Sequence, residues 1–445
     1  MELIASIPLV GGLLAVLIPF IVVLGIVVAV HEYGHYIIGR WCGIHAEVFS
    51  VGYGRPIWSR YDKRGTKWQI SWLPLGGYVK FLGDANASSF GDSDALDGMS
   101  QDERDRSFPG ASVGRRAATV AAGPVFNFIL STFLFAGVIM WMGIAVEPAT
   151  VAGMETPEIE QSPLEIGDQI IAVNGQDVTT MGEVSRVVLD MEGTGPIDLT
   201  VSRGDRKIDF QVPYLFPPLV TDVRPLSPAS TAGMKRGDFI MSLAGEDLVS
   251  FEDLKRIVLA SNGKDLEMVV RRNGELRTLF VTPEVSDIPT AEGGFEKRVM
   301  IGVVGSLAIN ELRESPGPIQ AFKFGGIAVY NTISTSLNAM KSLVTGALGL
   351  ENLSGPVGIA RVSGEQAAKS FIEYIEFMAI ISTAIGMLNL FPIPILDGGH
   401  LVIFAYEAVV GRQPAEKILN FAMSVGFVLL MALMVFATYN DVMKI

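Results

Sequence analysis

Residues 12–40 read GLLAVLIPFIVVLGIVVAVHEYGHYIIGR, an apolar run that ends in the motif His31-Glu32-Tyr33-Gly34-His35. The uncharged stretch begins at Leu3 and exceeds the roughly 20 residues that an α-helix needs to cross a bilayer. It is also too long for a signal peptide, and no basic segment precedes it. We therefore predict a transmembrane helix within 1–40, with two histidines and a carboxylate at its end.

Three further windows contain no Asp, Glu, Lys or Arg, namely 117–146, 377–396 and 418–440. With the first they predict a multi-pass α-helical membrane protein with four transmembrane helices, placed at 1–40, 113–145, 371–399 and 417–440. A hydrophobic fraction of 49% and a charged fraction of 18% fit this class and exclude a disordered chain. The net charge of −13 argues against a nucleic-acid partner.

The charges between the windows predict the orientation. Arg40 follows the first helix and Arg115-Arg116 precedes the second, so we expect the segment 41–112 to be cytoplasmic. Both termini and the segment between the second and third helices then lie on the other side. That segment is acidic: residues 147–314 hold 16 Lys and Arg against 28 Asp and Glu, a balance of −12.

The acidic segment contains an internal repeat. Residues 167–178 read GDQIIAVNGQDV, and residues 237–248 read GDFIMSLAGEDL, seventy positions later. Each copy combines turns, a short apolar strand and a helical pattern, which predicts two β-rich domains at 146–214 and 215–285. The pattern resembles PDZ domains, which bind extended peptides at a sheet edge. The copies could bind peptides in this way or could act only as a gate or spacer.

The other segments carry weaker patterns. Residues 47–54 and 67–81 alternate like strands and predict a β-hairpin beside the membrane on the cytoplasmic side, followed by an acidic loop over 85–109. Residues 286–370 are expected to form a linker and interfacial, amphipathic helices, lying in the interface or packed on the repeats. Residues 400–416 are expected to form a cytoplasmic loop.

The motif at the end of the first helix predicts metal chemistry. His-Glu-x-x-His on a helix places His31 and His35 one turn apart on one face, where they can share a zinc ion. Glu32 stands beside them and can take a proton from a water on the metal. Ionisable side chains inside a transmembrane helix cost free energy of insertion, so three of them within five residues indicate a functional site. The alternative interpretation is a helix end at the headgroups with merely polar histidines.

A third ligand is expected from the third helix. A catalytic zinc usually has three protein ligands and one open position. Asp397 follows Pro392 and Pro394, and by the topology above it lies at the same depth as the two histidines. Asn389 is a costly amide in hydrocarbon and is expected to contact a partner group. His400 could support the site or only face the interface.

Four motifs together resemble the site-2 protease family of intramembrane zinc metalloproteases. They are HEYGH at 31–35, PLGGYV at 74–79, GPVFN at 123–127 and NLFPIPILDGG at 389–399. The branch of this family with tandem PDZ domains matches the order of elements over nearly the whole chain. Asn127, within the third motif, could bond a neighbouring helix or assist the site.

The resemblance implies the following roles. His31, His35 and Asp397 would bind Zn²⁺, and Glu32 would be the catalytic base. The hairpin with Gly52 and Gly54 would guide the substrate, and Asn389, with Pro392 and Pro394 nearby, would hold the unwound chain. The implied partners are the lipid bilayer and substrates that cross the membrane once. Those substrates would be anti-sigma factors already trimmed by another protease, and remnant signal peptides. The implied location is the bacterial inner membrane, with periplasmic PDZ domains and termini and an active site near the cytoplasm.

Two other classes of function compete with a protease. A PDZ receptor or adaptor would keep the histidines as relics, but it would not need all three ligands and the base together. A transporter with an intramembrane metal site would be expected to have duplicated membrane halves, which the chain lacks.

Overall fold

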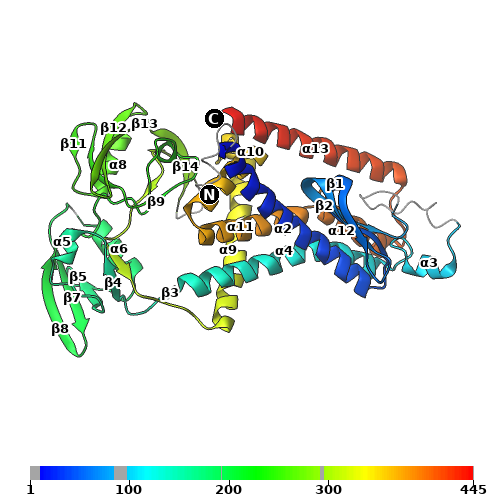
Figure 1. Cartoon of the computed structure of the whole chain (residues 1–445), viewed down its shortest axis with the longest axis horizontal. Coiled ribbons are helices and arrows are strands. Elements are labelled where there is room, and N and C mark those ends of the chain that lie inside the picture. Colours follow the sequence, from blue (N-terminus) through cyan, green and yellow to red (C-terminus); the bar gives the residue numbers. More distant parts are fainter. Residues whose placement is uncertain (1–10, 85–97, 192, 291–294, 444–445) are drawn as a thin grey trace. The chain divides into compact units, whose positions relative to one another are not determined.

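The computed structural model describes residues 11–84, 98–191, 193–290 and 295–443 (Figure 1). The start of the first apolar window, the acidic part 85–97 of the expected loop and both chain ends lie outside the described residues. The chain divides into two compact units. The first comprises Met1–Val138, Pro318–Leu343 and Leu350–Ile445, and the second comprises Ile139–Gly317 and Val344–Gly349.

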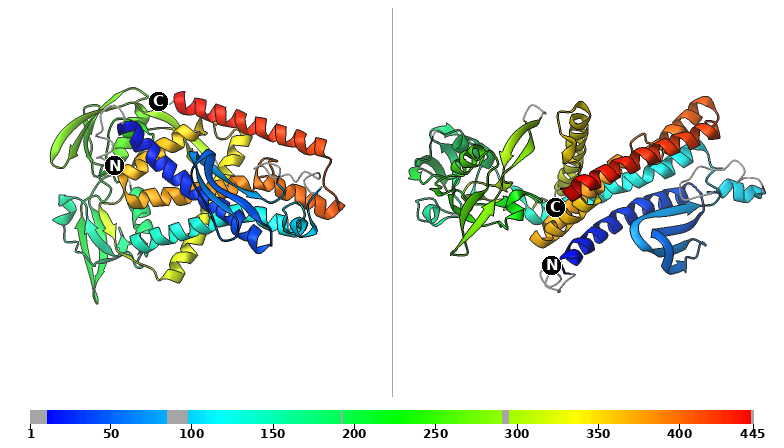
Figure 2. Two further views of the ribbon diagram at one scale, coloured as in Figure 1. Left: turned by 45° about the vertical axis from the view of Figure 1, so that its right-hand side comes forward. Right: turned by 90° about the horizontal axis from the view of Figure 1, so that it is seen from above.

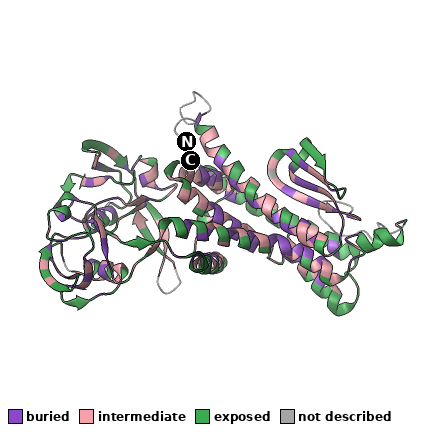
Figure 3. Ribbon diagram, turned by 60° about the horizontal axis from the view of Figure 1, so that its bottom comes forward, coloured by how far each residue is buried: buried purple, intermediate pink, exposed green. Residues whose placement is uncertain are grey.

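The first unit is built around four helices that are long and apolar enough to cross a membrane. They are α2 (Gly11–Trp41), α4 (Val113–Met142), α11 (Phe371–Asn389) and α13 (Glu416–Met443). The shortest has 19 residues, or about 28 Å of helix, close to the thickness of the hydrocarbon core. Much of their surface is exposed, as Figure 3 shows, and on α13 this surface includes Phe421 and Val428. The prediction of four candidate spans is confirmed.

The third apolar window is not one continuous helix. α11 ends at Asn389, and a second helix, α12 (Asp397–Val410), begins only at Asp397. The intervening residues contain Pro392 and Pro394, which lack the amide hydrogen that a continuing helix would require. The prediction of one helix over 371–399 is therefore wrong, and so is the loop over 400–416, because α12 occupies most of it.

Two more helices of the first unit lie between the second repeat and α11 in the sequence. α9 (Pro318–Thr345) packs on α4, where the rings of Phe322 and Phe133 meet edge to face at 4.7 Å. α10 (Pro356–Lys369) packs on α2, α11 and α13 and is preceded by a short 3-10 turn at Leu350–Asn352. Helices were expected here, and α9 packs on α4, one of the candidate spans. Figure 2 shows α9 crossing the direction of the long helices.

A curled antiparallel hairpin follows α2. Its strands are β1 (Ala46–Tyr61) and β2 (Lys67–Phe81), as expected, and the short helix α3 (Gln101–Arg106) precedes α4. The first part of β1, residues 46–51, pairs on one side with 67–70 and on the other with 77–81. Asp62, in the turn, accepts hydrogen bonds from the Tyr36 hydroxyl of α2 at 3.2 Å and from the Trp68 indole at 3.3 Å, which ties the hairpin to the helix.

The second unit contains the two repeats, and they have the same sheet topology. The first sheet has the order β6-β5-β7-β8 and the second the order β11-β10-β12-β13. The strands of the first copy are β5 (Gln169–Val173), β6 (Gln176–Asp177), β7 (Ile197–Arg203) and β8 (Arg206–Val212). Those of the second are β10 (Phe239–Leu243), β11 (Glu246–Asp247), β12 (Leu266–Arg272) and β13 (Glu275–Val281). The helices are α5 (Pro157–Glu160) and α6 (Met181–Leu189), then α7 (Pro228–Thr231) and α8 (Phe251–Ala260).

The repeated Gly-Asp dipeptide has a structural explanation. The Asp168 carboxylate is fully buried and accepts hydrogen bonds from Arg203, with Nε at 2.7 Å. Asp238 is buried in the same way and accepts from Arg272 at 2.6 Å. Each buried carboxylate is thus neutralised by an arginine at the end of the third strand of its sheet. The same ion pair occurs in both copies, which explains why the Gly-Asp dipeptide is repeated.

The repeats are completed by a segment beyond their predicted limits. Strands β16 (Val303–Val304) and β17 (Ile309–Glu311) pair with β9 (Asp222–Val223) and β4 (Val151–Met154), and β18 (Arg313–Glu314) pairs with β3 (Ile144–Ala145). A further hairpin joins β14 (Glu284–Pro289) and β15 (Phe295–Met300). The limits 146–214 and 215–285 therefore omit one strand of each copy, and 286–370 is not simply a linker.

Candidate metal centre and active site

Both histidines of the first-helix motif face the same direction. His31 and His35 lie one turn apart on α2, and their Nε2 atoms are 3.2 Å from each other. His31 is 8% exposed, so this pair of polar rings is withdrawn from solvent. Burial of two imidazoles side by side is unfavourable without a group that satisfies their nitrogen atoms.

Asp397 completes the group, although it is 362 positions beyond His35. It is the first residue of α12, and its Oδ2 lies 3.2 Å from His31 Nε2 and 3.6 Å from His35 Nε2. That buried oxygen has no hydrogen-bond partner within the described chain. The structure thus brings together the three residues that the sequence proposed as ligands.

The three ligand atoms fit a zinc ion. In a tetrahedral site with bonds of roughly 2.0–2.1 Å, ligand atoms stand about 3.3 Å apart. The three separations here, 3.2, 3.2 and 3.6 Å, match that edge length. Two imidazoles and one carboxylate, with one position left open, form the donor set of catalytic zinc sites.

Residues of helix α4 contact the Nδ1 atoms of both imidazoles and so orient the two rings. The Nδ1 atom of His35 donates to the Thr119 carbonyl at 2.9 Å, which leaves its Nε2 lone pair for a metal. The Asn127 amide nitrogen is 3.3 Å from His31 Nδ1. Turning this amide by 180° would present its oxygen, which has no partner among the described residues, to an Nδ1 proton. Asn127 therefore bonds a neighbouring helix, α2, and does so at one of the ligand residues.

Two glycines allow the helices to approach this closely. A Cβ atom on Gly34 of α2 would lie 2.5 Å from the Ala122 carbonyl oxygen of α4. A Cβ atom on Gly123 would lie 2.4 Å from His35 Nε2 and 2.8 Å from His31 Cε1. Any larger residue at either position would displace a helix or a ligand ring. Neither glycine was predicted to have a role, although Gly34 lies within the HEYGH motif and Gly123 within GPVFN.

Glu32 lies beside the ligands and against the hairpin. Val79 of β2 lies near its carboxylate, and Gly77 is so near that a Cβ there would be 3.1 Å from Glu32 Cγ. In the described structure, the segment 77–81 pairs only with 46–51, so its other edge carries no strand. A carboxylate and an open strand edge are thus adjacent.

The residues expected to contact substrate are spread over three elements. Asn389 is the last residue of α11 and makes no side-chain hydrogen bond within the described chain. Pro392 is exposed and Pro394 half-buried in the break before α12. Gly52 and Gly54 lie in β1 with φ near +90°, and a Cβ on Gly52 would lie 2.7 Å from the Leu73 carbonyl oxygen. His400 is buried on α12, one turn after Asp397.

Comparison with known families identifies the class of protein. The sequence model of peptidase family M50 matches residues 19–433, a range that includes all three ligand residues and Glu32. The chain belongs to peptidase family M50 and is a zinc metalloprotease of the site-2 type.

Individual relatives agree over almost the full length. A protein of Agrobacterium fabrum named as a zinc metalloprotease is 35% identical over 433 residues, covering 97% of each chain. The regulator of sigma-E protease of Salmonella typhi is 31% identical over 450 residues, covering 95% of this chain and 97% of that one. The regulator of sigma-E protease RseP of Escherichia coli is 30% identical over 452 residues, with the same coverage.

Proposed function

We propose that this protein is an intramembrane endopeptidase that hydrolyses peptide bonds within transmembrane segments of single-pass membrane proteins. The observation that carries the proposal is the placement of Glu32 and of a zinc-shaped ligand set at the end of a candidate membrane span. The ligands are His31, His35 and Asp397. A hydrolytic site in this position has access to bonds that soluble proteases do not reach.

The residues of the site divide the chemistry among them. A zinc ion held by the three ligands would polarise the scissile carbonyl and lower the pKa of a water molecule to about 7. Glu32 then accepts the proton of the attacking water and delivers it to the leaving amine. The Thr119 carbonyl holds His35 in the tautomer that keeps its Nε2 free, and Asn127, with its amide turned so that the oxygen faces Nδ1, does the same for His31.

The hairpin offers a place for the substrate backbone. A helical substrate hides its carbonyls in internal hydrogen bonds, so it must be extended before water can attack. The open edge of 77–81 beside Glu32 suits an extended strand, which would bind there by strand addition. Asn389, in the same proposal, donates to a carbonyl of this unwound segment. Gly52, Gly54, Pro392 and Pro394 shape the surrounding backbone.

The exposed side chains of the hairpin support its contact with the membrane. Large apolar residues are well exposed on both strands. They are Tyr53, Ile57, Trp58, Tyr61, Ile70, Trp72 and Leu73. Such a concentration of apolar surface is unusual for a water-exposed hairpin and suits the apolar and interfacial layers of a bilayer.

The two repeats are proposed to be PDZ domains that restrict access to the site. The first repeat has a cleft of about 680 Å³ between α6 and β17. β17 has β4 as its one strand neighbour in the described chain, so an extended peptide could pair with its other edge. Arg236, from the second repeat, also lines the cleft and has no partner among the described residues, so it could bind a carboxylate of that peptide.

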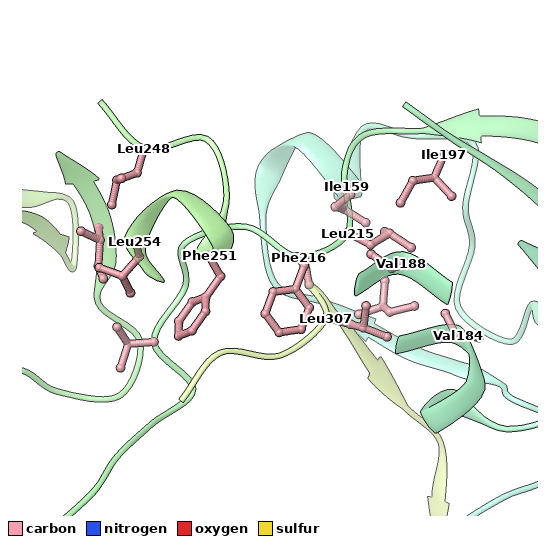
Figure 4. Close-up of a cluster of buried hydrophobic side chains, with 14 of the residues drawn as sticks. Ile159, Val184, Val188, Ile197, Leu215, Phe216, Leu248, Phe251, Leu254 and Leu307 are labelled. Carbon is pink, nitrogen blue, oxygen red and sulfur yellow. The ribbon is translucent and has the colours of Figure 1, made fainter. Parts of the chain in front are cut away.

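In the second repeat, the Phe251 ring occupies the position that corresponds to the cleft of the first. Phe251 begins α8 at the position where Met181 begins α6, and a Cβ on Gly305 would lie 2.5 Å from its ring. The same ring packs edge to face on Phe216 at 5.7 Å, as Figure 4 shows. We therefore assign peptide binding to the first repeat alone.

The proposed location is the bacterial inner membrane, with the repeats and both termini in the periplasm and the zinc site near the cytoplasm. Arg40 and Arg115 at the ends of α2 and α4 support this orientation. The proposed substrates are anti-sigma factors already trimmed by another protease, and remnant signal peptides. The names of the sigma-E-regulating relatives support the first of these.

A single substitution tests the enzymatic proposal. In purified protein in detergent, Glu32→Gln should retain zinc but lose cleavage of a tagged single-pass substrate by at least about 100-fold. An adaptor or a transporter would show no cleavage by the wild-type protein either. Undiminished cleavage by the variant, in a preparation free of other proteases, would refute the role of Glu32.

A further inference from the structure

A buried ion pair links α4 to α12 away from the ligand atoms. The Arg116 side chain is 6% exposed, and its Nη2 lies 2.6 Å from Oε1 of Glu407, which is 14% exposed. The Arg116 Nε also donates to the Ala111 carbonyl at 3.1 Å. By its position Arg116 is a topology signal, but its guanidinium is also buried and paired with a specific partner.

The ion pair lies on the same face of α12 as the proposed metal ligand. Asp397, His400, Phe404 and Glu407 follow one another at spacings of three, four and three residues, which places them along one stripe of the helix. His400 and Phe404 are buried, and Phe404 lies 5.1 Å beneath the Arg116 guanidinium. Glu407 is therefore about 15 Å along the helix from Asp397, on the same stripe of α12.

Arg116, the partner of Glu407, belongs to a single stripe of α4. Arg116, Thr119, Gly123 and Asn127 recur at spacings of three, four and four residues. Thr119, Gly123 and Asn127 contact the two imidazoles of α2, whereas Arg116 contacts α12. One face of α4 thus touches both helices that carry metal ligands.

We propose that the Arg116–Glu407 ion pair is a positioning pair, which fixes α12 along α4 and thereby sets where Asp397 meets His31 and His35. The inference rests on the proposed metal site. α12 follows a break of seven residues, so its position is not imposed by α11. A buried charge pair is suited to this task because a slide of α12 that separates the two groups would leave both charges buried without a partner, which is strongly unfavourable.

The test measures metal retention by the full-length protein in detergent. Zinc release to a colour-forming chelator and the visible absorption of the cobalt-substituted protein would be recorded beside the melting temperature. The variants are Glu407→Gln and the double variant Arg116→Met/Glu407→Met, with Asp397→Asn as the reference for a lost ligand. Arg272→Met is the matched control, because it removes a comparably buried ion pair from the second repeat.

We expect Glu407→Gln to release zinc at least about 10-fold faster than wild type, with a cobalt spectrum shifted towards that of Asp397→Asn. The double variant leaves no buried unpaired charge, so it should regain thermal stability yet still release zinc rapidly. Arg272→Met should leave both metal readouts unchanged. If Glu407→Gln does not fold, the double variant decides alone.

Wild-type zinc release and an unshifted cobalt spectrum in either folded variant would overturn the positioning role. Full recovery of zinc retention in the double variant would do the same, since apolar packing would then suffice. The proposed function fails by a different result, namely a wild-type protein that binds no zinc or a Glu32→Gln variant that still cleaves.

Discussion

Replacing Gly123 by alanine tests the ligand geometry through a single methyl group. The new Cβ would lie 2.4 Å from His35 Nε2 and 2.5 Å from His35 Cε1, with His31 Cε1 at 2.8 Å. Ordinary contact begins near 3.4 Å, so the His35 ring would have to retreat by about 1 Å, the difference between 3.4 and 2.4 Å. The backbone of α4 gives no relief, because Gly34 of α2 already touches the Ala122 carbonyl.

A displacement of this size is large compared with the tolerance of a metal site. Ligand distances in proteins hold to about 0.2 Å, and a misplacement of about 1 Å in a catalytic group can lower the rate about 100-fold. Alanine is meanwhile favoured over glycine in a helix by roughly 0.5–1 kcal/mol. We therefore expect zinc content and cleavage to fall sharply without the loss of stability that accompanies misfolding.

The assay compares zinc content, thermal unfolding and cleavage of a tagged membrane substrate. Gly137→Ala is the matched control, because it lies on the same helix with no atom within 4 Å of the new methyl group. It should gain the same helix propensity and keep its zinc and activity. Normal zinc content and cleavage in Gly123→Ala would contradict the ligand arrangement. A parallel loss in Gly137→Ala would attribute the effect to the helix as a whole.

Three further predictions concern the repeats. A deletion that joins Gly143 directly to Ser315 should remove both repeats without straining the chain, because the Ser315 hydroxyl already donates to the Met140 carbonyl at 2.7 Å. Cleavage should then extend to untrimmed substrates. Unchanged discrimination between untrimmed and trimmed substrates would refute the role of the repeats as a gate. Met181→Phe should fill the first cleft as Phe251 fills the second and abolish binding of labelled peptides to the full chain, whereas Met181→Leu should not. Burial acts to raise the pKa of Asp168, but hydrogen bonds from Arg203 and the Glu165 backbone hold that pKa below its usual value. The contribution of the Asp168 carboxylate to stability is thus present above about pH 4 and is lost as the pH falls through the lowered pKa. Calorimetry should therefore find that Asp168→Asn destabilises the protein less in acid than at neutral pH. A difference in stability between wild type and variant that does not change with pH would count against the ion pair.

Much of the candidate site could be predicted because its signals are local. The spacing of His31 and His35 fixes their common face, and four uncharged windows identify the spans without tertiary information. Asp397 was predicted as the third ligand from the membrane topology and from the resemblance to a family, because no local sequence pattern joins positions that are 362 residues apart. The break after Asn389 was misread because the window is apolar throughout, although Pro392 and Pro394 were visible as a source of distortion.

The features that were missed depend on long-range pairing. Arg116 carries the same charge whether it faces water or a buried Glu407, so the sequence indicates only its position near a candidate span. Strands β16 and β17 are two and three residues long, too short to show an alternating pattern. Their partners lie in the repeats, and nothing near residues 303–311 indicates which edge they join.

The return of β17 to β4 has a consequence for the order in which the protein can fold. Ile309 pairs with Met154, so the first repeat needs a strand that is synthesised 155 residues after its own. At about 5–20 residues per second, the ribosome requires roughly 8 to 30 s to make that stretch. Through this interval the second repeat emerges while the first still has an open sheet edge. The shared segment 303–311 therefore makes the two repeats mature together, at the end of their synthesis, and leaves an early window in which chaperones or stray strands can bind.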